Sequence, residues 1–204
     1  MSRKLRPCFE GGFYHVTNRG DNQEKIFSSN SDRVGMLDLL KKTKKKFGFK
    51  LHAFVFMRNH FHLLIETTDQ GTISEIMQYI NGNYTKLFNW IHKRTGHLFQ
   101  GRFHSSLIDK DAYLLEVSRY IHLNPVRAGL AKLPEDYKWS SYRGYLKKTK
   151  DDFIDKDLIL SMISNDTENQ VELYSKFVKA GISGELKVFK EKLYKGQLGP
   201  RVAR

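Results

Sequence analysis

Alternating and helical hydrophobic patterns divide the chain into short strands and longer helices. Aromatic and β-branched residues bounded by turn-forming residues predict strands over 13–17, 51–57, 60–66 and 105–108. The break at residues 58–59 predicts a hairpin between the second and third strands. Apolar residues recur at helical spacing in three longer stretches. These stretches are expected to begin at Ser31 or Asp32, Thr72 or Ser74, and Asp109 or Asp111, and to end near Gly48, Gly96 and Asn124.

The order of these elements predicts the fold class. Strand, helix, strand, strand, helix, strand, helix matches a ferredoxin-like or RRM-like split βαβ arrangement with one extra helix. We therefore expect an α+β fold with an antiparallel sheet and helices on one face. Helical stretches around 157–163, 171–180 and 186–194 predict a small helical extension, so we expect one domain over 1–146 and an appendage over 147–204. Such folds host many functions, and the function must be argued from the site.

Charge and composition point to a polyanionic partner. Of the 204 residues 40% are hydrophobic, which is typical of a globular chain, and the formal net charge is +13. Residues 1–150 carry 26 basic and 13 acidic side chains, whereas 151–204 carry 9 of each, so the excess lies in the first part. This asymmetry favours nucleic acid as the partner.

Cysteine use and hydropathy indicate a cytoplasmic protein. The single Cys8 can form neither an intramolecular disulfide nor a zinc site made of thiolates. No run of about 18 apolar residues could span a membrane, and no apolar segment follows the basic N-terminus. We expect no membrane partner, and association with the nucleoid when DNA is bound.

Two histidines on one strand are candidate metal ligands. In the strand 60–66, His60 and His62 point to one side while Phe61, Leu63 and Ile65 point to the other, where they belong in the core. Neutral imidazoles at this spacing can bind one divalent metal. Taken alone, a pair of this kind is more often packed or exposed than ligating.

The helix ending near Asn124 supplies further candidates. Tyr120 and Asn124 lie four residues apart on one helical face, one turn after Glu116. A metal held by two histidines and an amide oxygen would stabilise charge on a phosphodiester, with Tyr120 as the nucleophile and Glu116 as a possible activating group. The alternative for Tyr120 is a structural role, as an amphipathic core residue whose hydroxyl contacts water.

Several ordered segments resemble one family. Residues 57–66, Met-Arg-Asn-His-Phe-His-Leu-Leu-Ile-Glu, resemble the histidine–hydrophobe–histidine (HUH) motif of single-tyrosine transposases. The same family's hallmarks are similar to segments 12–20, 96–103, 109–114, 119–130 and 139–142. The resemblance is strongest to the REP-associated tyrosine transposases and covers roughly residues 5–146. Arg58 stands where relatives commonly have proline, and this departure leaves every candidate ligand in place.

The resemblance implies metal-dependent cleavage and strand transfer of single-stranded DNA. Tyr120 would form a 5′-phosphotyrosine, His60 and His62 would hold Mg²⁺ or Mn²⁺, and Asn124 would be the third ligand. The implied partner is a REP-like DNA hairpin. Basic residues of these motifs are candidates for DNA contact: Arg19, Arg102 and Arg127.

Other residues have simpler expected roles, and other functions remain open. We expect His15, His52 and His122 to be structural or exposed, and Trp90 to belong mostly to the core with Phe54, Phe56 and Phe88. The alternative function is a non-catalytic nucleic-acid-binding protein on the same fold. A third is a metal-dependent phosphoesterase that activates water. The active unit could be a monomer or a homodimer.

Overall fold

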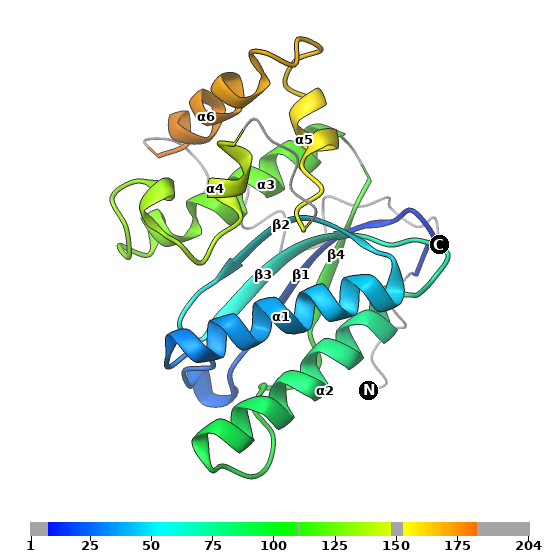
Figure 1. Cartoon of the computed structure of the whole chain (residues 1–204), viewed down its shortest axis with the longest axis vertical. Helices are drawn as coiled ribbons and strands as arrows, with labels where there is room; N and C mark the ends of the chain where they lie inside the picture. The colour runs from blue at the N-terminus through cyan, green and yellow to red at the C-terminus, as the bar shows by residue number, and fades with distance from the viewer. Residues whose placement is uncertain (1–7, 110, 148–152, 183–204) are drawn as a thin grey trace, which may run out of the picture.

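The computed structural model describes residues 8–109, 111–147 and 153–182 and contains a four-stranded antiparallel sheet between two layers of helices (Figure 1). The strands are β1 (Phe13–Arg19), β2 (Lys50–Phe56), β3 (His60–Glu66) and β4 (His104–Ile108). The longer helices are α1 (Asn30–Phe47), α2 (Ile73–His92), α3 (Asp111–Arg127) and α6 (Gln170–Ala180). Shorter helical elements are η1 (Asp21–Gln23), η2 (Pro134–Asp136), α4 (Tyr142–Tyr145) and α5 (Asp157–Ser161).

The strand order β2-β3-β1-β4 confirms the ferredoxin-like arrangement, including the hairpin between β2 and β3. In the register, Thr17 lies opposite His62 and Arg19 lies opposite His60. The first strand therefore continues to Arg19, beyond the expected end at residue 17. Pairing with β3 holds this polar end of β1 in the sheet.

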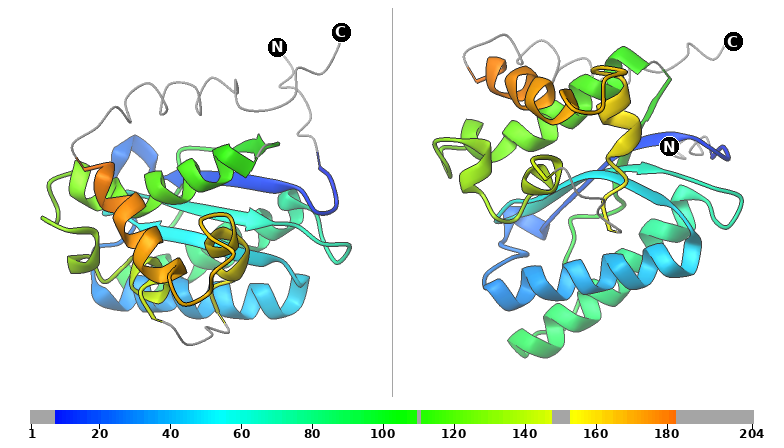
Figure 2. Two further views of the ribbon diagram at one scale, coloured as in Figure 1. Left: turned by 90° about the horizontal axis from the view of Figure 1, so that it is seen from above. Right: turned by 45° about the horizontal axis from the view of Figure 1, so that its top comes forward.

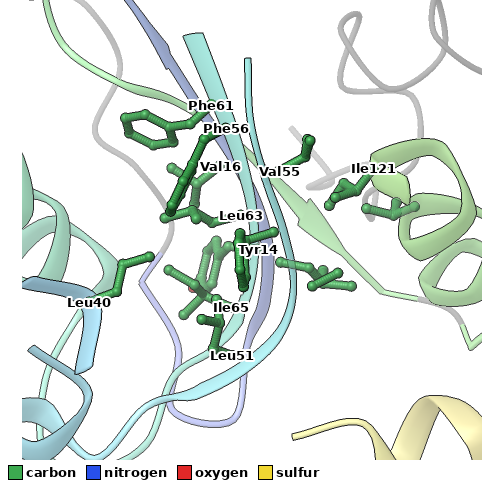
Figure 3. Packing of buried hydrophobic residues seen from close by; sticks show 14 of the residues in the cluster. Tyr14, Val16, Leu40, Leu51, Val55, Phe56, Phe61, Leu63, Ile65 and Ile121 are labelled. Atoms are coloured by element: carbon green, nitrogen blue, oxygen red, sulfur yellow. The ribbon is translucent and has the colours of Figure 1, made fainter. Parts of the chain in front are cut away.

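Both faces of the sheet are buried, which corrects one part of the expected architecture. The α+β class is as expected, but helices cover both faces and not one. Leu40 of α1 lies on the same side as Tyr14, Phe61 and the other core residues of the first face, whereas Ile121 of α3 lies with Val55 on the opposite side (Figure 3). The second face carries fully buried apolar side chains, and these require a cover that α3 provides.

Helix ends follow local capping rules, but the start of α1 and the end of α3 differ from the ends expected from the sequence. Ser29, and not Ser31 or Asp32, is the N-cap of α1, because it forms a capping box with Asp32. Thr72 caps α2 in the same way, as one of the two expected sites. The helix α3 continues past Pro125 to Arg127, and hydrogen bonding resumes after the proline, where the Ala128 N–H donates to the Asn124 carbonyl (3.0 Å). Gly129, with φ of +66°, follows this end.

Trp90 is not a core residue. Its exposed fraction is 80%, whereas Phe54, Phe56 and Phe88 are buried as expected. Trp90 follows Phe88 by two residues, which turns it roughly 200° around the helix and away from the buried face of α2.

The segments after α3 cover the free edge of β2. Backbone hydrogen bonds join Phe56 N–H to the Trp139 carbonyl and Ser141 N–H to the Phe54 carbonyl. Further along this edge, Asp155 accepts hydrogen bonds from Leu51 N–H (2.7 Å) and the Lys44 ammonium (2.6 Å). Residues 139–141 and Asp155 thereby blunt an edge strand that would otherwise be open to pairing.

The helices α5 and α6 lie beside α3, on the side away from the sheet (Figure 2). The expected helix around 186–194 lies outside the described residues. Among the helices of the described ranges, none combines the length and apolar character that a bilayer crossing requires.

A buried polar network ties α6 to α3 and to the edge of β2. His122 contacts the Tyr174 hydroxyl through Nδ1 (2.8 Å) and the Ser141 hydroxyl through Nε2 (2.8 Å). Tyr174 donates its hydroxyl proton to Ser118 (3.0 Å), so His122 donates to Tyr174 from Nδ1. Burial lowers the pKa of His122 to about 3, and the ring is neutral at physiological pH.

This burial predicts a pH-dependent stability. The unfolded chain binds a proton at His122 below about pH 6.5, whereas the folded protein does not until about pH 3. The free energy of unfolding should therefore fall as the pH is lowered from about 6 to about 4.5, and His122→Gln should reduce this slope by about 1.4 kcal/mol per pH unit. Urea denaturation at several pH values measures it.

The control is His97→Gln, because the His97 side chain is 75% exposed. This variant should keep the slope of the unaltered protein. Equal slopes for His122→Gln and the unaltered protein would contradict the prediction.

Candidate active site

The two histidines of β3 and the tyrosine of α3 meet on the face of the sheet that α3 covers. The rings of His60 and His62 are 5.1 Å apart between centroids and nearly perpendicular. The Tyr120 ring lies edge-on to His62, with centroids 5.5 Å apart. Tyr120 is 3% exposed, so its ring is enclosed between the helix and the sheet. The structure therefore joins the candidate nucleophile to the candidate metal ligands.

The hydrogen-bond partners of His60 define its tautomer. Asn59 donates its amide N–H to the Gln23 carbonyl (3.3 Å), which turns its Oδ1 toward Nδ1 of His60 at 2.7 Å. Because an amide oxygen only accepts, Nδ1 of His60 carries the proton. The lone pair of this imidazole is then on Nε2, the nitrogen that a metal would bind.

His62 is held from the other side by a third histidine. Nε2 of His15, on β1, lies 2.9 Å from Nδ1 of His62, and both side chains are about 1% exposed. Burial, with a smaller contribution from His104, lowers the pKa of His15 to about 3. His15 is thus a neutral, buried partner of a candidate ligand, in agreement with its expected structural role.

The remaining candidates on α3 have separate surroundings. Asn124 is half-buried, and its amide nitrogen is 3.5 Å from the Tyr120 carbonyl. Glu116 forms an ion pair with Arg119, whose guanidinium lies over Phe177 of α6. The guanidinium carbon of Arg127 is 6.0 Å from the centroid of the Tyr120 ring, at the distance limit of a cation–π contact.

A cleft of about 800 Å³ opens beside His60. Its lining includes two of the three arginines expected to contact DNA, Arg19 and Arg102, both exposed. The side chain of Arg19 donates to Gln100, which lines the same cleft. Exposed guanidinium groups around an open cleft beside His60 suit the binding of a phosphate backbone.

Sequence reasoning missed several residues of this site. Asn59, Gln100 and His104 were not among the candidates, although Asn59 orients His60 and the other two line the cleft. Alternation along 104–108 predicts that His104 shares a sheet face with Ser106, but no local signal places that face next to His15. The Asn59 contact could have been suspected from its position immediately before His60.

The candidate ligands fit a divalent metal by their chemistry. Each imidazole has Nδ1 engaged by a neighbour, which is how proteins orient metal-binding histidines. Within the described ranges no group of three or more His, Cys, Asp and Glu residues is arranged to hold a metal. The expected set contains two histidines and an amide, and so it does not depend on such a group.

Comparisons with known proteins agree with this site. A REP-associated tyrosine transposase of Haemophilus influenzae is 25% identical over 158 residues, which cover 72% of this chain and 89% of the relative. The solved structure of a REP-associated tyrosine transposase bound to a REP hairpin has a TM-score of 0.60 at 23% identity, covering 72% of this chain and 86% of the other, and supports the fold.

A transposase structure from Deinococcus radiodurans has a TM-score of 0.41 at 16% identity, covering 59% of this chain and 94% of the other. The profile of the family described as "Transposase IS200 like" matches residues 8–124, more than half of the chain and the whole stretch from β1 to Asn124. The chain therefore belongs to the IS200-like transposase family, whose members are DNA-processing enzymes.

Proposed function

We propose that this protein cuts and rejoins single-stranded DNA at hairpin-forming repeats, through a 5′-phosphotyrosine on Tyr120. The observation that carries the proposal is the edge-on contact of Tyr120 with His62, whose neighbour His60 lines a cleft together with Arg19 and Arg102. The family supports DNA processing, and the solved relative is described as bound to a REP hairpin. We assign the catalytic set to residues 1–146 and a supporting role to 147–204.

His60, His62 and Asn124 would hold Mg²⁺ or Mn²⁺. Nδ1 of each imidazole is engaged, by Asn59 and by His15, and Nε2 is the nitrogen that would bind the metal. When bound, the metal would stabilise negative charge on the scissile phosphate. Because His62 lies against the Tyr120 ring, these ligands would place the ion near the phenol.

The chemistry of Tyr120 conserves the phosphodiester bond energy. Its hydroxyl oxygen attacks the phosphorus, the bond to the 3′ oxygen breaks, and the leaving oxygen takes a proton while the phenol loses one. A second 3′-hydroxyl can then attack the phosphotyrosine and release Tyr120. Burial of the Tyr120 ring between α3 and the sheet excludes bulk water, which favours strand transfer over hydrolysis. The activating role of Glu116 stays a prediction. In the structure its carboxylate forms an ion pair with Arg119.

The first test is a covalent adduct. Tyr120→Phe removes only the nucleophilic oxygen, so the variant should fold and bind DNA but form no adduct with single-stranded hairpin oligonucleotides in Mn²⁺. With the unaltered protein, the 3′-labelled strand should migrate with the protein on a denaturing gel. The 5′-labelled fragment should run free, and EDTA should abolish both signals.

Tyr113→Phe is the matched control, because Tyr113 is a half-buried tyrosine on the same helix. It should form the adduct like the unaltered protein. Cleavage that persists in Tyr120→Phe with no adduct in the unaltered protein would replace this mechanism by water activation. Tight binding without cleavage would favour the non-catalytic DNA-binding protein.

The second prediction concerns the contribution of the cleft arginines to DNA binding. Arg102→Ala should weaken binding to single-stranded DNA for all sequences and lower the slope of log K against log salt by about 0.7 for one lost phosphate contact. Arg127 is expected to contribute to DNA contact as well. Fluorescence anisotropy over a series of salt concentrations measures the slope.

Lys176→Ala is the control for charge alone, since Lys176 lies on α6 with its side chain 69% exposed. This variant removes the same charge outside the cleft and should keep the salt slope. Equal slopes for the two variants would remove Arg102 from the DNA-binding surface.

A further inference from the structure

We propose that His15 is a positioning residue for the metal site, because it selects the tautomer of His62 and holds the plane of its ring. This inference rests on the proposed metal ligation by His60 and His62. It concerns β1, which contributes none of the proposed ligands.

The geometry of the two rings shows an in-plane hydrogen bond. The planes of His15 and His62 differ by 4°, and their centroids are 5.1 Å apart. The joining nitrogens are 2.9 Å apart. Parallel rings at this centroid distance, with nitrogens so close, lie edge to edge in one plane and not face to face. The hydrogen bond is therefore directed along the lone pair of the acceptor.

The direction of this hydrogen bond decides whether His62 can bind a metal. If His62 donates from Nδ1, its Nε2 carries the lone pair, and His15 accepts at Nε2. If His15 donates instead, the proton of neutral His62 lies on Nε2 and blocks ligation there. Metal binding at Nε2 therefore requires an acceptor at His15. Carboxylates and backbone carbonyls commonly supply this acceptor in metal sites, and here a neutral imidazole supplies it.

His15 also contacts the candidate nucleophile. The Tyr120 ring stands at 86° to His15 and 89° to His62, with centroid distances of 5.9 Å and 5.5 Å. The phenol ring thus packs against both coplanar imidazoles and is nearly perpendicular to each. A rotation of the His62 ring would disturb this packing as well as break the hydrogen bond, so His15 couples the orientation of the ligand to that of Tyr120.

The experiment compares two substitutions of His15. His15→Gln keeps an acceptor near the position of Nε2, whereas His15→Leu keeps the volume and removes the acceptor. Mn²⁺ affinity, measured by electron paramagnetic resonance of the free ion, should fall about 10- to 100-fold in His15→Leu and recover largely in His15→Gln. Nitrogen-15 NMR of the metal-free unaltered protein should show His62 protonated at Nδ1, with the resonance assigned by His62→Gln.

The control is His52→Leu, because His52 is an equally buried histidine that contacts the Asp155 carbonyl and Glu66. It should lower the melting temperature and leave Mn²⁺ affinity unchanged. Unaltered affinity in a folded His15→Leu variant would overturn the inference. If that variant fails to fold, an Nε2-protonated His62 in the unaltered protein overturns it.

If His60 and His62 do not bind a metal at all, the Mn²⁺ measurements give a different result. In that case the unaltered protein does not bind Mn²⁺, or binds it equally well after His60→Ala, and both the site and the role of His15 are rejected. Binding that depends on His60 but not on His15 rejects the role of His15 alone.

Discussion

Burial of β3 on both faces is the constraint on which the rest of the structure depends. Phe61, Leu63 and Ile65 need the cover of α1 and α2, while the opposite face carries Leu64 and the two histidines beneath α3. Because successive side chains alternate, the apolar packing of one face determines where His60 and His62 must point. The same packing that stabilises the sheet therefore also presents the candidate ligands to α3.

The second layer converts a polar strand face into an enclosed site. α3 contributes Val117 and Ile121 to the core and Tyr120 to the histidines, so one amphipathic helix carries both stabilising and chemical residues. Its position is supported from outside by Tyr174 of α6, through the network around His122. The helix α6 thereby contributes to the placement of Tyr120, although it contributes none of the proposed catalytic side chains.

The two candidate ligands of β3 are engaged by side chains that are not proposed as ligands themselves. Asn59 and His15 engage the Nδ1 atoms of the two candidate ligands from different elements, a turn and a neighbouring strand. The two contacts are independent, because one depends on the hairpin and the other on the pairing of β1 with β3. Two residues outside the proposed catalytic set, Asn59 and His15, therefore organise the surroundings of the candidate ligands.

Local periodicity determined the order of strands and helices, the hairpin, the opposite faces of β3 and the common face of Tyr120 and Asn124. These features depend on repeats of two or about 3.6 residues, which a single chain displays. Tertiary structure alone decided that α3 covers the second face, that His15 bonds to His62, that Trp90 is exposed, and that Asp155 caps the edge of β2. Each of these depends on contacts between residues far apart in the chain, and periodicity within one element carries no information about its neighbours.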